Sequence, residues 1–301
     1  MERQTILHMF TPGRQMSPFD INMAVDAGYQ VVVPYCGVAA GEIRGLTQDA
    51  IFSRGPKGVK ATGIFIGGRD VLLAADMLDS ARQAMVPPFA VSVMADPSGS
   101  YTTAAALVAC VERRLQQAHG TDLAGKGVVI LGGTGTVGRI AGVLAAGLGA
   151  RVSLGHHVDR AQAEDAALAT GERFACRLQG VDASTPARRR ELLAEADVVL
   201  ATAAAGIQVV DGDTLAAAGR LLVAADVNAV PPSGIAGVGV MDDGVPLPAG
   251  RGVGIGALAV GNVKYQVEHR LLVAMRTAEK PVYLGFNEAF AEARAVLAGE
   301  G

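Results

Sequence analysis

The chain is poor in the residues that mark several classes of protein. It has no tryptophan, aromatic residues make up only 4%, and it has three cysteines, Cys36, Cys110 and Cys176. Their number is odd, and their spacing matches neither a C-x-x-C pair nor a set of metal ligands. This argues against a disulfide scaffold and a zinc site, and no metal is expected. We expect each cysteine to be a small buried hydrophobe in a reducing compartment.

Charge is also sparse. Only 18% of the residues are charged, the net charge is −3, and basic residues are scattered rather than clustered, which argues against a nucleic-acid footprint. No apolar run reaches the length needed to cross a bilayer, and the first residues lack the pattern of a signal peptide. We therefore expect a cytoplasmic protein that binds neither nucleic acid nor membrane.

Apolar residues and glycine are abundant instead. Half of the 301 residues are hydrophobic and 39 are glycine, and the length predicts about two domains. Short apolar runs alternate with helical patterns, which predicts βαβ units and parallel sheets. Strands are expected at residues 5–10, 30–35, 63–67, 89–95, 128–132, 151–155, 173–181, 197–202, 220–225 and 252–255. In the first part of the chain, helices are expected at residues 18–27, 47–53, 69–85 and 99–118.

These patterns predict an α/β fold of two domains. Residues 1–120 form an N-terminal α/β substrate domain with a parallel sheet, and residues 121–262 form a Rossmann-type, doubly wound parallel-sheet domain. Residues 263–301 are mostly helical. Since Val263, Val267, Leu271 and Met275 form an apolar stripe, we expect this tail to pack back and complete the first domain.

The most specific motif opens the second domain. A predicted strand ends in the turn Gly133-Thr134-Gly135-Thr136-Val137-Gly138, which has the spacing G-x-G-x-x-G. A helix and a second strand follow within about thirty residues, in the order that a dinucleotide-binding unit requires. Such glycines allow a tight turn and a close approach of backbone N–H groups to a pyrophosphate, which the helix N-terminus also attracts. We expect residues 133–138 to bind a dinucleotide, although a plain strand-to-helix turn would use the same residues.

The end of the second strand bears on which dinucleotide binds. An NAD-selective unit carries an acid about twenty residues past the glycines, and this chain has His156 and His157 there, with Arg160 close behind. A missing carboxylate and nearby cations favour the 2′-phosphate of NADP. NAD stays possible because Asp159 is near enough to reach a ribose. The alternative is that the two histidines only cap a solvated loop.

Further non-repetitive stretches stand where strands should end, at residues 17–22, 95–105, 225–234 and 256–264. Two more distinctive stretches lie at residues 51–54 and 63–68. Their order and spacing, over almost the whole chain, resemble those of the NAD(P)-dependent methylene-tetrahydromethanopterin dehydrogenases of methylotrophic bacteria. Members that accept only NADP carry an arginine at the position of His156, so this chain looks closer to the members that use both cofactors. The resemblance implies a cytoplasmic homo-oligomer of one-carbon metabolism.

The implied reaction is hydride transfer from the methylene bridge of the pterin carrier to NAD(P)⁺, which leaves the methenyl form. Two nitrogens flank the bridge carbon and delocalise the developing cation, so no general base is needed. Consistently, none of the five tyrosines is followed four residues later by a lysine. This counts against short-chain dehydrogenases and against methylene-tetrahydrofolate dehydrogenases of the same two-domain plan. The folate enzyme remains the runner-up, followed by a non-catalytic NADP sensor.

Several residues are candidates for the site. Lys264 is expected in the first turn of a helix over residues 261–278, where a cation opposes the helix dipole. The resemblance also points to it as the catalytic residue that orients the substrate and tunes its charge; the alternative is an exposed lysine paired with Glu268. Expected substrate ligands are Asp20, Asp96, Ser98, Ser100 and Thr102, and expected ligands of the cofactor's nicotinamide end are Asp226 and Asn228.

Each of these side chains has an ordinary structural alternative. Asp20, Asp96 and their neighbours follow predicted strands and open predicted helices, where acids and hydroxyls serve as caps. Asp226 and Asn228 precede a pair of prolines and are as well suited to forming a turn. Arg54 and Arg69 offer charge to anionic ends of the substrate, although most surface arginines have no such role.

Overall fold

The computed structural model describes residues 3–248, 250 and 252–299. The chain divides into two compact units. Unit 1 comprises Met1–Thr102 and Tyr265–Glu292, and unit 2 comprises Thr103–Lys264 and Ala293–Gly301. The boundary at Thr103 lies within helix α5 (Ser100–His119), which the sequence prediction assigned whole to the N-terminal domain.

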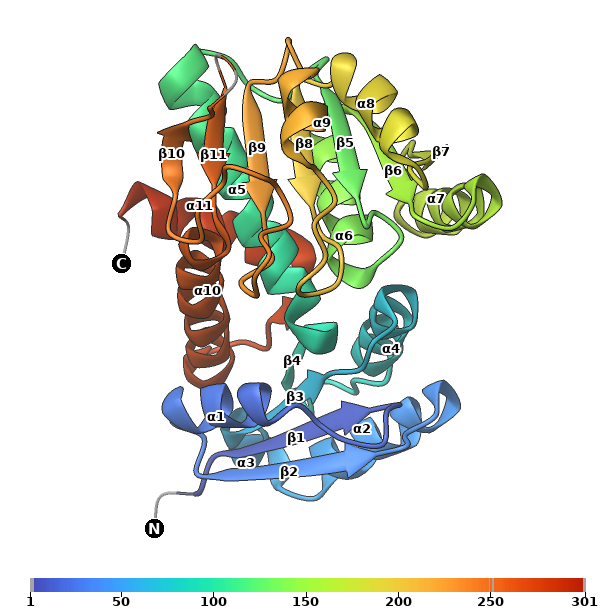
Figure 1. Cartoon of the computed structure of the whole chain (residues 1–301). Coiled ribbons are helices and arrows are strands. Elements are labelled where there is room, and N and C mark those ends of the chain that lie inside the picture. Colours follow the sequence, from blue (N-terminus) through green and yellow to red (C-terminus); the bar gives the residue numbers. More distant parts are fainter. Residues whose placement is uncertain (1–2, 249, 251, 300–301) are drawn as a thin grey trace. The chain divides into compact units, whose positions relative to one another are not determined.

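Unit 1 contains a five-stranded parallel sheet with the strand order β12-β4-β3-β1-β2. Its strands are β1 (Ile6–Thr11), β2 (Val31–Cys36), β3 (Thr62–Ile66), β4 (Ser92–Ala95) and β12 (Tyr283–Leu284). Its helices are α1 (Pro18–Asp26), α2 (Ile43–Phe52), α3 (Gly55–Gly58) and α4 (Val71–Gln83), and it shares α5, α10 (Ala257–Thr277) and α11 (Phe286–Ala298) with unit 2. Strand β1 leads to β2 on one side, and β3 lies on its other side, so the order reverses between β1 and β3 (Figure 1). Such a reversal is where open α/β sheets bind ligands.

Local sequence explains where the helices of unit 1 start. Asp70 caps α4, because one carboxylate oxygen accepts the backbone N–H groups of Leu72 and Leu73 at 2.9 and 3.1 Å. Helix α1 begins as expected, with Ser17 at the cap position and Pro18 as the first helical residue. The Ser17 side chain, however, makes no capping hydrogen bond.

Unit 2 contains a seven-stranded sheet with the order β10-β11-β9-β8-β5-β6-β7. Its strands are β5 (Gly127–Leu131), β6 (Arg151–His156), β7 (Gln179–Asp182), β8 (Val198–Ala201), β9 (Val223–Asp226), β10 (Asp243–Pro246) and β11 (Val253–Ile255), and its own helices are α6 (Thr136–Gly147), α7 (Arg160–Phe174), α8 (Pro186–Ala194) and α9 (Gly212–Ala216). All pairs are parallel except β10 with β11. The order of the parallel strands is that of a doubly wound dinucleotide-binding sheet, which reverses between β5 and β8.

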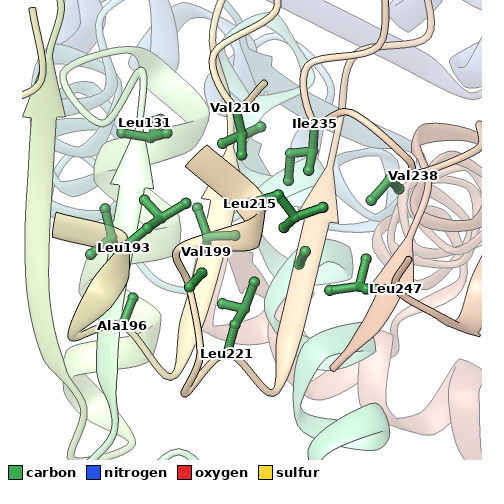
Figure 2. Close-up of a cluster of buried hydrophobic side chains, with 14 of the residues drawn as sticks. Leu131, Leu193, Ala196, Val199, Val210, Leu215, Leu221, Ile235, Val238 and Leu247 are labelled. Carbon is green, nitrogen blue, oxygen red and sulfur yellow. The ribbon is translucent and has the colours of Figure 1, made fainter. Parts of the chain in front are cut away.

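The two faces of this sheet are apolar, as the near-continuous hydrophobic strands require. Alternate residues Val129 and Leu131 of β5 join a buried cluster with Leu193 of α8 and Leu215 of α9 (Figure 2). Ile130 points to the opposite face, where it lies within 3.5 Å of the position a Cβ on Gly142 of α6 would take. Helices therefore cover both faces, which confirms the predicted fold class of two α/β units with parallel sheets.

Several predicted boundaries are wrong. The strand expected at residues 173–181 is only Gln179–Asp182, because α7 continues through Phe174 and ends where Ala175 adopts a left-handed φ of 52°. The tail is mostly helical as expected but also holds β12, which pairs with β4. The antiparallel β10 has no counterpart in the prediction, since its sequence DGVP reads as a turn.

The cysteines are less buried than the sequence predicted. Cys110 is buried, but Cys36 is exposed at the end of β2 and Cys176 is half-buried after α7. Within residues 3–248, 250 and 252–299, no helix is long and apolar enough to cross a membrane. The same residues include no group of three or more His, Cys, Asp or Glu side chains arranged to hold a metal ion.

Candidate functional site

The glycine turn of unit 2 lies at the carboxyl end of β5, at the reversal of the sheet. Gly132 has a φ of +81°, a conformation that side chains rarely adopt. A Cβ there would also lie 2.6 Å from the backbone nitrogen of Ala203, so the turn packs directly on the loop that follows β8. Gly135 then precedes the first residue of α6, and its N–H donates to the Gly132 carbonyl at 3.0 Å.

Gly138 is the position where helix and turn approach most closely. A Cβ on Gly138 would lie 2.7 Å from the Cα of Gly133 and 2.8 Å from both the Gly132 carbonyl oxygen and the Thr202 hydroxyl. The Thr202 hydroxyl itself is 3.2 Å from the carbonyl oxygens of Leu131 and Gly132. The arrangement is a backbone cradle at a helix N-terminus, which suits a pyrophosphate. The residues from Gly133 to Gly138 thus lie where the motif predicts, and Gly132 and Thr202 are additional members.

The end of β6 carries the predicted cofactor-selecting residues. His156 is the last strand residue and is buried, and its ring stands 4.7 Å from the exposed ring of His157, centroid to centroid. Asp159 caps α7 by accepting the Gln162 N–H at 2.8 Å. Its carboxylate is therefore engaged with the helix. Arg160 is exposed and pairs with Glu164 at 2.6 Å, so one of the expected cations has a local partner.

The loop after β9 uses Asp226 and Asn228 to hold itself together. Both are buried. Asp226 accepts the N–H groups of Asn228 and Ile235 at 2.9 and 3.2 Å. Burial raises the pKa of the Asp226 carboxyl, and backbone hydrogen bonds from Asn228, Ile235 and Gly234 partly oppose that rise.

Asn228 is more fully engaged. Its side-chain oxygen accepts the N–H groups of Gly206 and Val230 at 3.0 and 2.9 Å, and its amide donates to the Pro232 carbonyl at 2.8 Å. These bonds tie the loop after β9 to the loop after β8, which carries Gly206. The turn-forming role, given in the sequence analysis as the alternative for Asp226 and Asn228, is thus present in the fold.

Unit 1 has a cavity of about 700 Å³. The segments that line it follow β1, β3 and β4, three adjacent strands that include the β1/β3 reversal. The lining residues are Thr11, Pro12, Gly13, Arg14, Gln15, Met16, Ser17, Pro18, Asp20, Gly68, Arg69, Asp70, Leu73 and Ser98. This volume is within the range of small-molecule sites, about 300–1,000 Å³. The position and the size of this cavity therefore suit a small-molecule site.

Two of the five predicted substrate ligands line this cavity. Asp20 lies in the first turn of α1 and is 2% exposed. Ser98 is exposed and has a φ of 56°, which is uncommon outside glycine and costs free energy. Strained residues of this kind gather at binding sites, because the surrounding fold must compensate for them.

The other three predicted ligands are fully buried and act on the backbone around them. Asp96 accepts the Tyr101 and Thr102 N–H groups at 2.8 and 3.3 Å and the Thr102 hydroxyl at 2.6 Å. Ser100 donates its hydroxyl to the Pro97 carbonyl at 2.6 Å. This network fixes the start of α5 and the turn that carries Ser98. The capping alternative therefore accounts for Asp96, Ser100 and Thr102.

The two arginines behave differently. Arg54 donates to the carbonyl oxygens of Ala61 and Gln4 at 3.1 and 2.9 Å, so its guanidinium ties loops of unit 1 together. Arg69 lines the cavity together with Arg14, a residue that the sequence analysis did not select. No motif marks Arg14; only the reversal of the strand order at the loop after β1 would have identified it.

Lys264 does not lie in a first turn. Helix α10 begins at Ala257, so Lys264 is two turns inside it, and the argument from an opposing helix dipole is wrong. Its side chain is half-buried rather than exposed, and Glu268, one turn further on, is fully buried. The reason to single out Lys264 is then the family resemblance alone.

A doubly wound sheet with a glycine cradle at its reversal, joined to a second α/β unit, defines the two-unit architecture common among NAD(P)-dependent dehydrogenases. Quinate dehydrogenase from Corynebacterium glutamicum, solved in complex with NAD, shares this fold, with a TM-score of 0.55 and 14% identity over 98% of this chain and 99% of that one.

Sequence relatives are more specific. A family model described as methylene-tetrahydromethanopterin dehydrogenase, N-terminal, matches residues 18–98. The NAD(P)-dependent methylenetetrahydromethanopterin dehydrogenase of Methylorubrum extorquens is 49% identical over 287 residues, which cover 95% of this chain and 97% of that protein. The bifunctional protein MdtA of the same organism is 33% identical over 89% of this chain and 91% of its own length. The chain belongs to the NAD(P)-dependent methylenetetrahydromethanopterin dehydrogenase family, and the predicted family is confirmed.

Proposed function

We propose that this protein oxidises methylene-tetrahydromethanopterin to the methenyl form by transferring a hydride to NAD(P)⁺, as a step in one-carbon (formaldehyde oxidation) metabolism. The observation that carries the proposal is the 49% identity to a dehydrogenase of that name over nearly the full length of both chains. The glycine cradle of unit 2 and the cavity of unit 1 support it, because the reaction needs one site for a dinucleotide and one for a pterin.

The glycine turn fits the cofactor. The absence of a side chain at Gly138 lets α6 pack closely on Gly132, Gly133 and Thr202, so that the N-terminus of the helix, whose first N–H groups have no partner within the helix, faces the place of the pyrophosphate. Residues from Gly133 to Gly138 would hold the pyrophosphate, and the loop with Asp226 and Asn228 is proposed to lie against the nicotinamide end. When bound, the nicotinamide supplies the hydride acceptor.

For the pterin, Asp20 is the proposed partner. Its carboxylate is buried at the cavity, where it is suited to accept hydrogen bonds from the paired N–H groups of a pterin ring. Ser98 offers a hydroxyl at the same cavity, while Asp96, Ser100 and Thr102 fix the turn behind it. Lys264 is proposed to orient the substrate and tune the charge that develops on it. Since the substrate delocalises that charge itself, positioning is the main task.

We further propose that NADP is preferred and NAD accepted. Asp159, the first acid after β6 in the sequence, is engaged in capping α7, and His157 is exposed just past the end of the strand, where it can donate to a 2′-phosphate. Arg160 is also exposed, and it would have to exchange its ion pair with Glu164 for the phosphate. A preference for NAD of tenfold or more in kcat/KM would contradict this proposal. Location in the cytoplasm, assembly into a homo-oligomer, and the absence of bound metal, nucleic acid and membrane partners complete the proposal, and light scattering would measure the oligomer.

A direct assay tests the reaction. Purified protein is mixed with NADP or NAD and with methylene-tetrahydromethanopterin or methylene-tetrahydrofolate, and the absorbance of reduced nicotinamide is followed. We expect turnover with the methanopterin carrier, faster with NADP. Turnover with the folate carrier alone would identify the protein as a methylene-tetrahydrofolate dehydrogenase instead. No turnover with either carrier would exclude both dehydrogenase activities.

A further inference from the structure

The cavity of unit 1 is lined by charged residues of both signs. Its lining includes two arginines, Arg14 from the loop after β1 and Arg69 from the loop after β3. These loops flank the reversal of the strand order between β1 and β3, so the two cations come from the two sides of the same crevice.

Neither guanidinium has a hydrogen-bond or ion-pair partner in the described part of the chain. Within residues 3–248, 250 and 252–299, Arg14 and Arg69 make no ion pair and no side-chain hydrogen bond, whereas Arg54, Arg276 and Arg294 all do. The neighbouring acid, Asp70, uses one carboxylate oxygen to accept two N–H groups at the N-terminus of α4. Among the described residues, these two exposed arginines thus lie at the cavity without an ion pair, and the other acid of the lining, Asp20, is buried.

The loop that carries Arg14 is held in place. The Gly13 N–H donates to the Thr11 hydroxyl at 3.1 Å, and the Gly13 carbonyl accepts the N–H of Gly37, beyond the end of β2, at 2.8 Å. Arg69 directly precedes Asp70, which is fixed as the cap of α4. Both arginines therefore extend from anchored backbone, which lowers the entropic cost of ordering them on a ligand.

From these observations we infer that Arg14 and Arg69 bind the anionic end of the side chain of the pterin substrate. This inference rests on the proposed function and adds to it which residues bind the anionic end of the carrier. Guanidinium groups match carboxylate and phosphate oxygens with paired hydrogen bonds. In this arrangement Asp20 accepts from the pterin ring and the arginines donate to the far end, so opposite charges on the cavity set the direction in which the carrier lies.

Kinetics with two forms of the substrate test the inference. We compare wild type with Arg14→Ala, Arg69→Ala and the double variant, using methylene-tetrahydromethanopterin and an analogue truncated before its anionic groups. Each single change is expected to raise KM for the full carrier about 5- to 30-fold, with kcat at saturation and KM for NADP unchanged. With the truncated analogue, wild type and variants should give the same kcat/KM.

Two controls make the test specific. Arg44→Ala removes an exposed, unpaired arginine of α2 in the same unit and should leave every constant unchanged. Arg69→Lys keeps the charge but not the paired donors and should give an intermediate KM. Wild-type KM should also rise with ionic strength more steeply than that of the double variant.

The outcomes separate this inference from the proposed function. Unchanged KM for the full carrier in the double variant, or an equal loss with the truncated analogue, overturns the role of the arginines and leaves the dehydrogenase intact. If wild type gives no turnover, equilibrium binding of the full carrier, measured by calorimetry, decides. If wild type binds the carrier and the double variant does not, the anionic subsite is supported. If the double variant binds as tightly as wild type, or if neither binds, the anionic subsite is overturned.

Discussion

At the residue scale, the polar side chains that follow the strands mostly hold loops together. Asp96 and Asn228 were chosen because an acceptor at the carboxyl end of a parallel strand is well placed for a ligand. In the structure both accept backbone N–H groups of their own loops. Helix capping and ligand binding both use acidic, amide and hydroxyl side chains at the carboxyl ends of strands. The sequence alone therefore does not separate the two roles.

Asp226 leads to a prediction about pH. Burial raises its pKa above the ordinary value of 3.8, so the folded protein binds its proton more tightly than the unfolded chain does. Its contribution to stability is therefore fully present below pH 3.8 and is lost as pH rises through the raised pKa. Carboxyl ¹³C shifts should show Asp226 titrating above 3.8, and Asp226→Asn should flatten this part of the stability curve. A midpoint at or below 3.8 would contradict the prediction.

Lys264 leads to a prediction about rate. If it orients the substrate and tunes its charge, Lys264→Ala should lower kcat about 100-fold, the typical effect of removing one electrostatic contact from a reacting centre. The melting temperature should change little, since the side chain is only half-buried. The matched variant Lys280→Ala, near the start of β12, should keep the wild-type rate. Wild-type kcat and KM in Lys264→Ala would remove this residue from the site.

At the element scale, the glycine turn was the best-predicted part of the molecule. Strand β5, the turn and α6 follow one another as expected, because the motif fixes a local backbone path that needs no distant partner. Gly132 was missed, since its role arises from packing against Ala203 of another loop. The same reason explains why β10 and β12 were missed: each is short, and only its neighbour in the sheet makes it a strand.

Two glycines of α6 allow a paired test. Gly138→Ala would press a methyl group to within 2.8 Å of backbone at Gly132 and Gly133, so we expect weaker NAD(P) binding and a loss of about 1–3 kcal/mol in unfolding free energy. Gly147→Ala, in the last turn of the same helix, meets nothing within 4 Å and should be neutral or stabilise by up to about 1 kcal/mol. Denaturant unfolding measures the change in stability of each variant, and cofactor titration measures its affinity for NAD(P). Equal effects of the two changes would contradict the proposal that close packing at Gly138 shapes the cofactor site.

At the scale of the whole molecule, the chain combines two sheets of different order, each reversing once. The sequence predicted two parallel-sheet units, since alternating strands and helices leave little choice. It did not predict the strand orders, because local sequence patterns do not show which strand each crossover connection places next to which. The cavity followed from those orders: its lining loops are adjacent only because β1, β3 and β4 are neighbours.

Hydrogen exchange should separate the two sites. NADP alone is expected to slow exchange in the glycine turn, residues 132–138, because bound ligand suppresses local opening. The reduced carrier alone should instead slow exchange in residues 11–18 and 68–73, the loops of the unit 1 cavity. Protection of the unit 1 loops by NADP alone, without protection of the glycine turn, would contradict this assignment.

The edge strand β12 has a consequence for how the protein folds during synthesis. Residues 283–284 complete the sheet of unit 1, yet they are translated long after β4, whose edge they cover. The sheet of unit 2, which ends at residue 255, leaves the ribosome first in complete form. Until the tail arrives, the nascent first unit presents an unpaired strand edge, the kind of surface that chaperones protect from aggregation.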